Sequence, residues 1–235
     1  MIDFHTHILP GLDDGATNPD ISMEMLGMER QHGIEYVVCT PHFYANKDLS
    51  EYFFKYRDEA KKIVEDRARE EKTDIPKLIM GAEVRLTRGL SSCEYLKDMR
   101  IENTDYILIE LPYDEWSNKW IAEELYAIKA KTNLKIILAH AERYIQDKKD
   151  FEIIQSYFRF SSVIQINMES FLVRTGRKWI KKFIKHNCAV IVGSDCHSAG
   201  RRKPCMDEGF RMIEKKFGKE YKDAFIENAK VILDL

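Results

Sequence analysis

Short apolar segments alternate with longer charged segments along the whole chain. Seven of the apolar segments are rich in β-branched residues, which favour strands. These predicted strands cover residues 2–7, 36–42, 77–84, 106–112, 135–142, 162–170 and 188–197. Most are apolar at consecutive positions rather than at every second one, which is typical of parallel strands buried on both faces.

The longer segments between the strands have the apolar spacing of helices with one solvated face. The clearest of them cover residues 20–32, 50–72, 118–132 and 176–186. Strands that alternate with helices predict an α/β fold with a parallel sheet. Seven such units without an obvious linker favour a distorted, TIM-like (β/α)7 barrel that forms one domain over residues 1–235. An open doubly wound sheet is the alternative, although no G-x-G-x-x-G follows any predicted strand.

Composition narrows the classes of function. The chain has 235 residues, 44% of them hydrophobic, which is enough for a large core. Its net charge of −2 argues against a general nucleic-acid binder. No apolar run approaches the roughly 18 residues that cross a bilayer, so we expect no membrane insertion. The five cysteines have no regular spacing, so they do not form a disulfide framework, and we expect a cytoplasmic location.

Polar donor residues lie where the predicted strands end. His5 and His7 share one face of the first strand, and Asp14 follows in a loop that can fold back toward them. The later strands end in or near His42, Glu83, Glu110, His140, Asp195 and His197. In a parallel β/α barrel these carboxyl ends meet on one face, where active sites are built.

Each donor has an ordinary explanation when it is considered alone, as a solvated loop acid or a hydrogen-bonded core histidine. Together on one face these carboxylates and imidazoles need partners, because burying unpaired charge is costly, and metal cations supply that partner. Five imidazoles and four carboxylates are too many for one ion with about four to six ligands. The pattern therefore predicts a cluster of two or three cations.

The motifs that carry these donors are MIDFHTH, DDG, CTPH, GAEV, LIEL, AHAERY and SDCH. Together they resemble the polymerase and histidinol phosphatase (PHP) family. The closer resemblance is to the bacterial manganese-dependent protein-tyrosine phosphatases of capsule and exopolysaccharide operons. It covers nearly the whole chain and implies a distorted seven-unit barrel with three metal ions.

The same resemblance implies a role for each donor. The three ions would be held by His5, His7, Glu83 and Asp195, by Glu83, Glu110 and His140, and by Asp14, His42 and His197. Manganese is the metal that the family implies, and the mixed donors also suit iron, zinc or magnesium. The phosphate-binding arginines would be Arg143 and Arg201, with Arg202 as the alternative to Arg201.

The implied activity is hydrolysis of phosphotyrosine by a hydroxide that the metals generate from water. The implied partner is a tyrosine-phosphorylated protein, a tyrosine kinase of capsular or exopolysaccharide synthesis. A small-molecule phosphatase acting on histidinol phosphate is the alternative within the family. A non-catalytic metal-binding scaffold and a barrel amidohydrolase are two further alternatives. Against the amidohydrolase, no predicted strand ends in the lysine that commonly bridges the metals of that class.

A different chemistry is also compatible with part of the chain. Cys196 and Arg202 have the C-x5-R spacing of thiol-based tyrosine phosphatases, in which a thiolate of low pKa attacks phosphorus. The flanking Asp195 and His197 are already assigned to the metals, and strand alternation should turn Cys196 away from them. Asp3 would share the face of His5 in a regular strand and is a candidate partner of the ligands.

Overall fold

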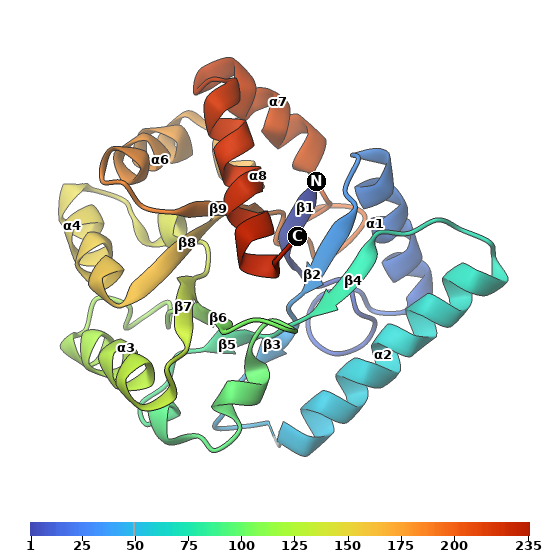
Figure 1. The fold of residues 1–235 in the computed structure, drawn as a ribbon, viewed down its shortest axis with the longest axis horizontal. Helices are drawn as coiled ribbons and strands as arrows, with labels where there is room; N and C mark the ends of the chain where they lie inside the picture. Colours follow the sequence, from blue (N-terminus) through green and yellow to red (C-terminus); the bar gives the residue numbers. More distant parts are fainter. Residues whose placement is uncertain (49) are drawn as a thin grey trace.

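Parallel strands form the centre of the computed structural model, which describes residues 1–48 and 50–235 (Figure 1). A three-stranded sheet has the order β1 (Ile2–Thr6), β2 (Tyr36–Cys39), β4 (Lys77–Met80). A six-stranded sheet has the order β3 (His42–Phe43), β5 (Glu83–Arg85), β6 (Tyr106–Glu110), β7 (Lys135–Leu138), β8 (Ser161–Asn167), β9 (Val190–Gly193). Every strand pair is parallel, as the continuous apolar runs predict.

Two of the predicted strands are interrupted near their ends. Residues 36–42 form β2 and β3, and residues 77–84 lie in β4 and β5. Pro41, which has no N–H to donate to a ladder, lies in the first break. The pairing continues across it, because the N–H of Glu83 donates to the carbonyl of Pro41 at 3.0 Å. Each interrupted strand thus passes from the smaller sheet into the larger one.

Backbone contacts also join the other edges of the two sheets. The N–H of Asp195 donates to the carbonyl of His5 at 2.8 Å, and the N–H of His7 donates to the carbonyl of Cys196 at 3.0 Å. The seven strand units therefore follow one another around a common axis (Figure 1). The α/β class is confirmed, with the strands hydrogen-bonded as two sheets rather than as one uninterrupted cylinder.

The helices lie around the strands (Figure 1). They are α1 (Pro19–Gln31), α2 (Ser50–Glu70), α3 (Lys119–Thr132), α4 (Lys148–Ser156), α5 (Met168–Leu172), α6 (Arg174–Lys185), α7 (Met206–Lys216) and α8 (Lys219–Leu233). The four predicted helices correspond to α1, α2, α3 and α6, with ends that differ by at most two residues. Within residues 1–48 and 50–235, none of the helices combines the length and apolar composition of a membrane span.

The space between the strands is apolar at one end and polar at the other. Leu108 and Val163 belong to a buried apolar cluster that Ile232 of α8 completes. Two residues further along the same strands, toward their carboxyl ends, lie Glu110 and Gln165. The apolar end thus forms a packed base, and the polar end is left for chemistry.

A bulge in β1 changes which side chains face inward. The register of β1 against β2 shifts between Asp3 and Thr6. Asp3 groups with the carboxylate of Glu29 and the thiol of Cys196, whereas His5 faces Gln165. The expectation that Asp3 shares the face of His5 is therefore wrong, because a bulge re-aims the residues that follow it. The Asp3 carboxylate instead accepts from the N–H of His5 at 3.2 Å.

The close approach of β1 and β9 gives a first prediction. A Cβ on Gly193 would lie 2.6 Å from the Cβ of His5 and 2.8 Å from its backbone nitrogen. We expect Gly193→Ala to lower the free energy of unfolding by about 1–3 kcal/mol, because packed backbone must move. Urea denaturation measures the change.

Gly27 of α1 provides a matched control. An added Cβ there meets nothing within 4 Å. Alanine is the better helix former, so Gly27→Ala should stabilise the protein by about 0.5–1 kcal/mol. Wild-type stability in Gly193→Ala would contradict the described packing of β1 on β9.

Candidate metal centre

The nine donor side chains expected from the sequence lie together at the carboxyl ends of the strands. They come from β1 and the loop after it, from β3, β5 and β6, and from the segments that follow β7 and β9. In chain order they are His5, His7, Asp14, His42, Glu83, Glu110, His140, Asp195 and His197.

The carboxylate of Glu83 lies at the centre of this group. Its Oε2 is 3.3 Å from His5 Nε2, 3.2 Å from His7 Nε2 and 3.0 Å from His42 Nδ1. Its Oε1 is 2.8 Å from His140 Nε2. The Glu83 side chain is 1% exposed, so the four imidazoles replace water around it.

One side of the group is formed by the paired histidines of β1. His5 Nε2 and His7 Nε2 are 3.1 Å apart and both point toward Glu83. Asp195 Oδ1 lies 3.7 Å from the first of these nitrogens and 3.5 Å from the second. Two imidazoles and two carboxylates thus converge on one point.

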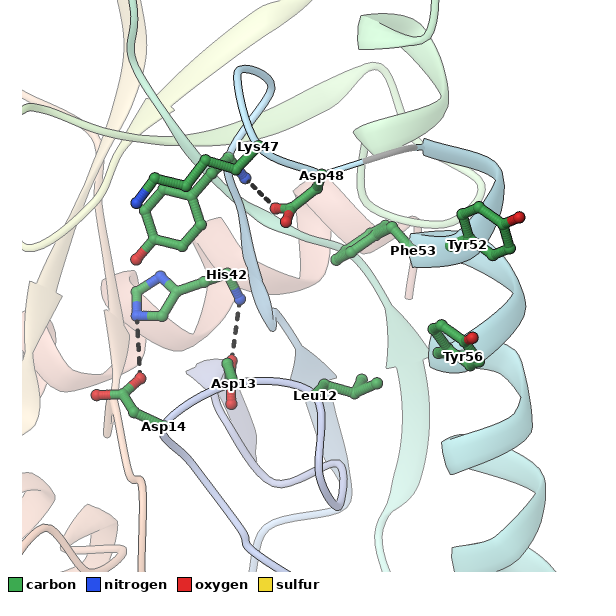
Figure 2. A pocket seen from close by; sticks show the side chains of 10 residues that line it. Leu12, Asp13, Asp14, His42, Lys47, Asp48, Tyr52, Phe53 and Tyr56 are labelled. Carbon is green, nitrogen blue, oxygen red and sulfur yellow. Dashed lines mark hydrogen bonds and ion pairs between the residues drawn. The ribbon is translucent and has the colours of Figure 1, made fainter.

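The loop after β1 folds back over the strand end, and Asp13 holds it there. Asp13 Oδ2 lies 2.7 Å from His7 Nδ1 and accepts from the backbone N–H of His42 at 3.0 Å (Figure 2). Asp13 Oδ1 accepts from the N–H of Gly15 at 2.9 Å. Of Asp13 and Asp14, we predict from the sequence that Asp14 is the metal ligand. The contacts of Asp13 give it a different role, which is to orient the ring of His7.

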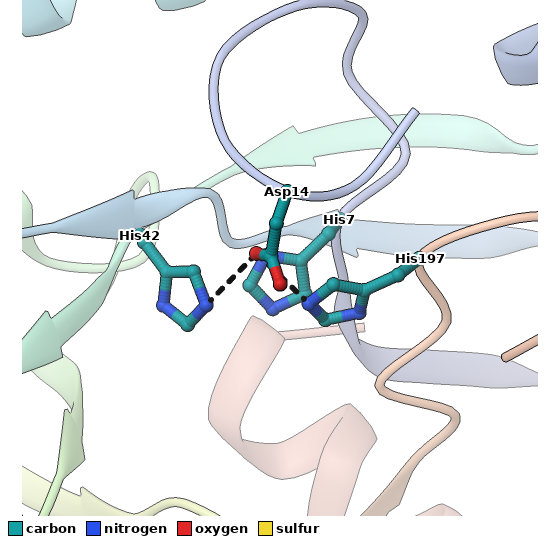
Figure 3. A group of neighbouring side chains, drawn as sticks. All are labelled: His7, Asp14, His42 and His197. Carbon is teal, nitrogen blue, oxygen red and sulfur yellow. Dashed lines mark ion pairs between the residues drawn. The ribbon is translucent and has the colours of Figure 1, made fainter. Parts of the chain in front are cut away.

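Asp14 lies between two imidazoles as a result of this turn. Its Oδ1 is 3.4 Å from His42 Nε2 and 3.4 Å from His197 Nε2, with His7 beside them (Figure 3). The Asp14 side chain is 67% exposed, so this part of the group is open to solvent.

The opposite side is formed by Glu110 and His140. Glu110 Oε1 lies 3.8 Å from His140 Nε2. Its other oxygen accepts from Arg85 Nη1 at 2.8 Å. This guanidinium fixes the orientation of the carboxylate, so that one oxygen faces the histidine.

Several buried atoms of the group have no hydrogen-bond partner within residues 1–48 and 50–235. They are Glu83 Oε2, His42 Nδ1, His140 Nδ1 and His197 Nε2. Unpaired buried polar atoms are costly, and a divalent cation would satisfy those that point into the centre.

The donor atoms form three groups that could each hold a cation, with all ligand atoms of a group within 4.8 Å of one another. The groups are His5, His7 and Glu83; His42, Glu83 and Glu110; and His7, Asp14, His42 and His197. Compared with the three expected sites, Asp195 is outside the first group, His42 stands in place of His140 in the second, and His7 is added to the third. The residues present therefore fit a cluster of cations.

Comparison with known proteins then assigns the family. A model of the capsular polysaccharide synthesis proteins CpsB/CapC matches residues 1–234. The chain belongs to the CpsB/CapC family. It is 30% identical to the tyrosine-protein phosphatase YwqE of Bacillus subtilis over 245 positions, which cover 99% of this chain and 91% of that one.

A second relative, the tyrosine-protein phosphatase CpsB of Streptococcus pneumoniae, is 28% identical over 100% of this chain and 99% of its own. A solved structure, from work on YwqE and CpsB as unique metal-dependent tyrosine phosphatases, superposes with a TM-score of 0.80. It is 24% identical and covers 100% of this chain and 94% of that one, so it shows the same fold.

The side chains of this CpsB/CapC protein perturb one another's protonation. Burial raises the pKa of Glu83, but the imidazole of His5 and the hydrogen bond with His140 hold that pKa well below its usual range. Burial lowers the pKa of His7, but Asp13 and Glu83 raise it to about 10. The carboxylates are thus ionised, and a proton on His7 partly compensates them when no cation is bound.

Two polar residues of β8, which the sequence reasoning missed, hold the ligands in place. Gln165 Oε1 lies 3.0 Å from His5 Nδ1 and accepts from the N–H of His140 at 2.7 Å. Asn167 Nδ2 donates to Asp195 Oδ2 at 2.8 Å. The sequence does carry a sign of them, since both are amides at alternate positions at the end of a strand whose middle is apolar.

The arginines of the centre meet at Asp195. Arg143 Nη1 donates to Asp195 Oδ2 at 2.9 Å, and Arg202 Nη2 lies 2.9 Å from Asp195 Oδ1. Arg202 also reaches Asp14, with Nη1 4.0 Å from Oδ2. Arg201 is exposed and, among the residues described, makes no ion pair with the nine donors. The geometry therefore brings Arg143 and Arg202 to the centre and leaves Arg201 outside it.

The thiol of Cys196 faces away from the metal centre. It is fully buried, and its sulfur groups with the carboxylates of Asp3 and Glu29. Burial raises the pKa of Cys196 well above its usual value. The alternation expected for this segment is confirmed, and the C-x5-R interpretation is wrong because the thiol can neither ionise readily nor reach a substrate.

Loss of the His7 proton on metal binding is a second prediction. The raised pKa means that this proton stabilises the metal-free fold fully below pH 6.5, and that its contribution is lost as the pH rises through about 10. A cation must displace it, so metal affinity should rise with pH across this window. Calorimetric titration with Mn²⁺ in two buffers at pH 7.5 should show release of at least about one proton.

The exposed His186 provides the control. His186→Ala should release as many protons as the wild type. Metal binding without proton release, or an affinity independent of pH between 6.5 and 10, would contradict the assigned state of His7.

The place of Cys196 gives a third prediction. Cys196→Ala should keep phosphatase activity within about twofold, because the thiol takes no part in the reaction. Treatment with EDTA should abolish activity in both proteins, and Mn²⁺ should restore it. Activity that survives EDTA and is lost in Cys196→Ala would support the thiol mechanism instead.

Proposed function

We propose that this CpsB/CapC protein is a metal-dependent protein-tyrosine phosphatase. The observation that carries the proposal is the buried carboxylate of Glu83 within four imidazoles, with two arginines beside the same centre. Relatives named tyrosine-protein phosphatases match the chain along its whole length, which supports the same substrate class.

Three divalent cations, manganese by preference, are the cofactors that we propose. His5, His7, Glu83 and Asp195 would hold the first, Glu83, Glu110 and His140 the second, and Asp14, His42 and His197 the third. When bound, the cations neutralise the charge of the phosphoryl group and lower the pKa of a water so that it can attack phosphorus.

The chain itself supplies the grip on the phosphoryl group. The side chains of Arg143 and Arg202 are 44% and 38% exposed, so each has N–H groups left for a ligand after pairing with Asp195. A guanidinium binds two phosphoryl oxygens in parallel, which positions the group as well as stabilising its charge. This role falls on Arg202 in place of Arg201.

The protonation state of His197, beside the solvent-exposed Asp14, suits a tyrosine leaving group. Burial and the neighbouring His7 lower the pKa of His197 to about 4, so its imidazole is neutral at pH 7 and available as a ligand. It is then a poor proton donor. Tyrosinate has a conjugate-acid pKa near ~10 and needs protonation less than an alkyl alkoxide does.

The proposed partner is an autophosphorylated tyrosine kinase, whose dephosphorylation would regulate capsular or exopolysaccharide synthesis. The family model describes capsular polysaccharide synthesis, which supports that setting. All five cysteines are free, which supports the cytoplasmic location proposed from the sequence.

A side-by-side assay tests this function. The manganese-loaded protein is given a phosphotyrosyl peptide and histidinol phosphate under the same conditions. We expect kcat/KM for the peptide to be higher by at least about tenfold, because an aryl oxide leaves more readily. A preference for histidinol phosphate would instead support the small-molecule phosphatase.

The two neighbouring arginines give a fourth prediction. Arg202→Ala should lower kcat/KM for the phosphotyrosyl peptide by about 10²-fold, since it removes a charged donor from the reacting group. Arg201→Ala is the matched control and should stay within about twofold. Metal content should be unchanged in the control. The reverse order of effects would return the phosphate-binding role to Arg201.

A further inference from the structure

A large cavity adjoins the metal centre on the side of α2. Its volume is about 700 Å³, and it shares Asp14 and His42 with the centre. Tyr52, Phe53 and Tyr56 of α2 line its far side (Figure 2). Cavities of about 300–1,000 Å³ hold whole ligands, so this one has room for more than a single phosphotyrosine ring.

A second cavity, of about 580 Å³, meets the first at Tyr44 and Lys47. Arg85, Arg88 and Trp120 are among the residues that line it. We name these two adjoining cavities the peptide groove. It runs from an aromatic end at α2, past the metal centre, to a cationic end.

The aromatic end offers unused apolar surface. Tyr52 and Tyr56 are 47% and 51% exposed, and their rings stack on each other with centroids 6.2 Å apart. Exposed aromatic rings that form one wall of a cavity bind other apolar or aromatic side chains well. The two rings line the same cavity as Asp14 and His42 of the metal centre.

The cationic end offers unused charge. Lys47 Nζ lies 5.3 Å from the centroid of the Tyr44 ring, and the Arg88 guanidinium lies 4.8 Å from that of Trp120. Within residues 1–48 and 50–235, Arg85 pairs with Glu110, whereas neither Lys47 nor Arg88 has an ion-pair partner. Glu115, the acid of this end, already accepts from Trp120 Nε1 at 2.8 Å.

The acids at the aromatic end are also occupied. Asp48 Oδ2 accepts from the N–H of Tyr44 at 2.6 Å, and Asp13 is committed to His7 and His42. These acids keep their charge, but their oxygens already have donors, and among the described residues they form no ion pair with Lys47 or Arg88. An anionic side chain beside the phosphotyrosine would supply these two cations with a partner.

We propose that the peptide groove selects the residues next to the phosphotyrosine. An aromatic residue on one side packs on Tyr52 and Tyr56, and an acidic residue on the other side pairs with Lys47 and Arg88. This specificity rests on the proposed function, since the phosphate must occupy the metal centre for its neighbours to reach both ends.

A substrate panel tests the proposal with the manganese-loaded full chain. It comprises a phosphotyrosyl peptide with one aromatic and one acidic neighbour, two peptides in which serine replaces either neighbour, and 4-nitrophenyl phosphate. The wild type should prefer the full peptide to each serine peptide by about tenfold in kcat/KM, mainly through KM. Rates are normalised to 4-nitrophenyl phosphate, which has no neighbours to bind.

Paired variants assign each preference to its end of the groove. Tyr52→Ala with Tyr56→Ala should remove the preference for the aromatic neighbour and keep that for the acidic one. Lys47→Ala with Arg88→Ala should do the opposite. The exposed Tyr126 and Lys185, on α3 and α6, supply the controls, and Tyr126→Ala and Lys185→Ala should keep both preferences.

Two results would overturn the proposal, and they are distinguishable from failure of the proposed function. The first is equal cleavage of all three peptides by the wild type. The second is a loss of normalised rate that is the same for every peptide in both variants. Failure of the function itself would appear as no cleavage of any phosphotyrosyl peptide beside efficient cleavage of histidinol phosphate.

Discussion

The structure depends on how a buried negative charge is compensated at the carboxyl ends of its strands. Glu83 is 1% exposed, and its two oxygens face four imidazole rings within 3.3 Å. Imidazoles alone can neutralise it only by holding protons, and they then repel one another at the 3.1 Å that separates His5 from His7. Divalent cations relieve both problems, because they pair with the carboxylate and use neutral histidines as ligands.

The fold delivers the donors to this point through small departures from regular strands. The bulge in β1 turns His5 and His7 inward, and the break at Pro41 carries His42 across to the larger sheet beside Glu83. The apolar cluster that α8 closes keeps the opposite end rigid. Hydrogen bonds of Gln165 with His5 and of Asp13 with His7 then fix the orientations of these two imidazole rings. The orientation of the ligands is thus fixed by contacts within the chain.

Much of this could be read from the sequence because the relevant signals are local. The apolar runs mark the strand units, and the change from apolar to polar at their ends marks the donors. The order of strands in a parallel fold then makes those donors neighbours without any knowledge of distances. The helices with a clear apolar stripe, such as α2 and α3, were predicted for the same reason.

Features that depend on packing could not be read in this way. The bulge that separates Asp3 from His5 lies where β1 pairs with β2 and also bridges to Cys196, after β9. The choice between Arg201 and Arg202 depends on how one loop turns, which no spacing specifies. Helices α4, α5, α7 and α8 lie outside the four clearest helical segments of the sequence. The groove beside α2 is likewise visible only once Tyr44 and Tyr52 are placed on one side of the centre.

The most direct test is the metal content of the purified protein, measured by mass spectrometry of the elements for the wild type and for Glu83→Gln. We expect about three equivalents of divalent metal per wild-type chain and the loss of at least about two in the variant, because Glu83 would be shared between two of the ions. Full activity on a phosphotyrosyl peptide without bound metal, or equal metal content in the two proteins, would contradict it.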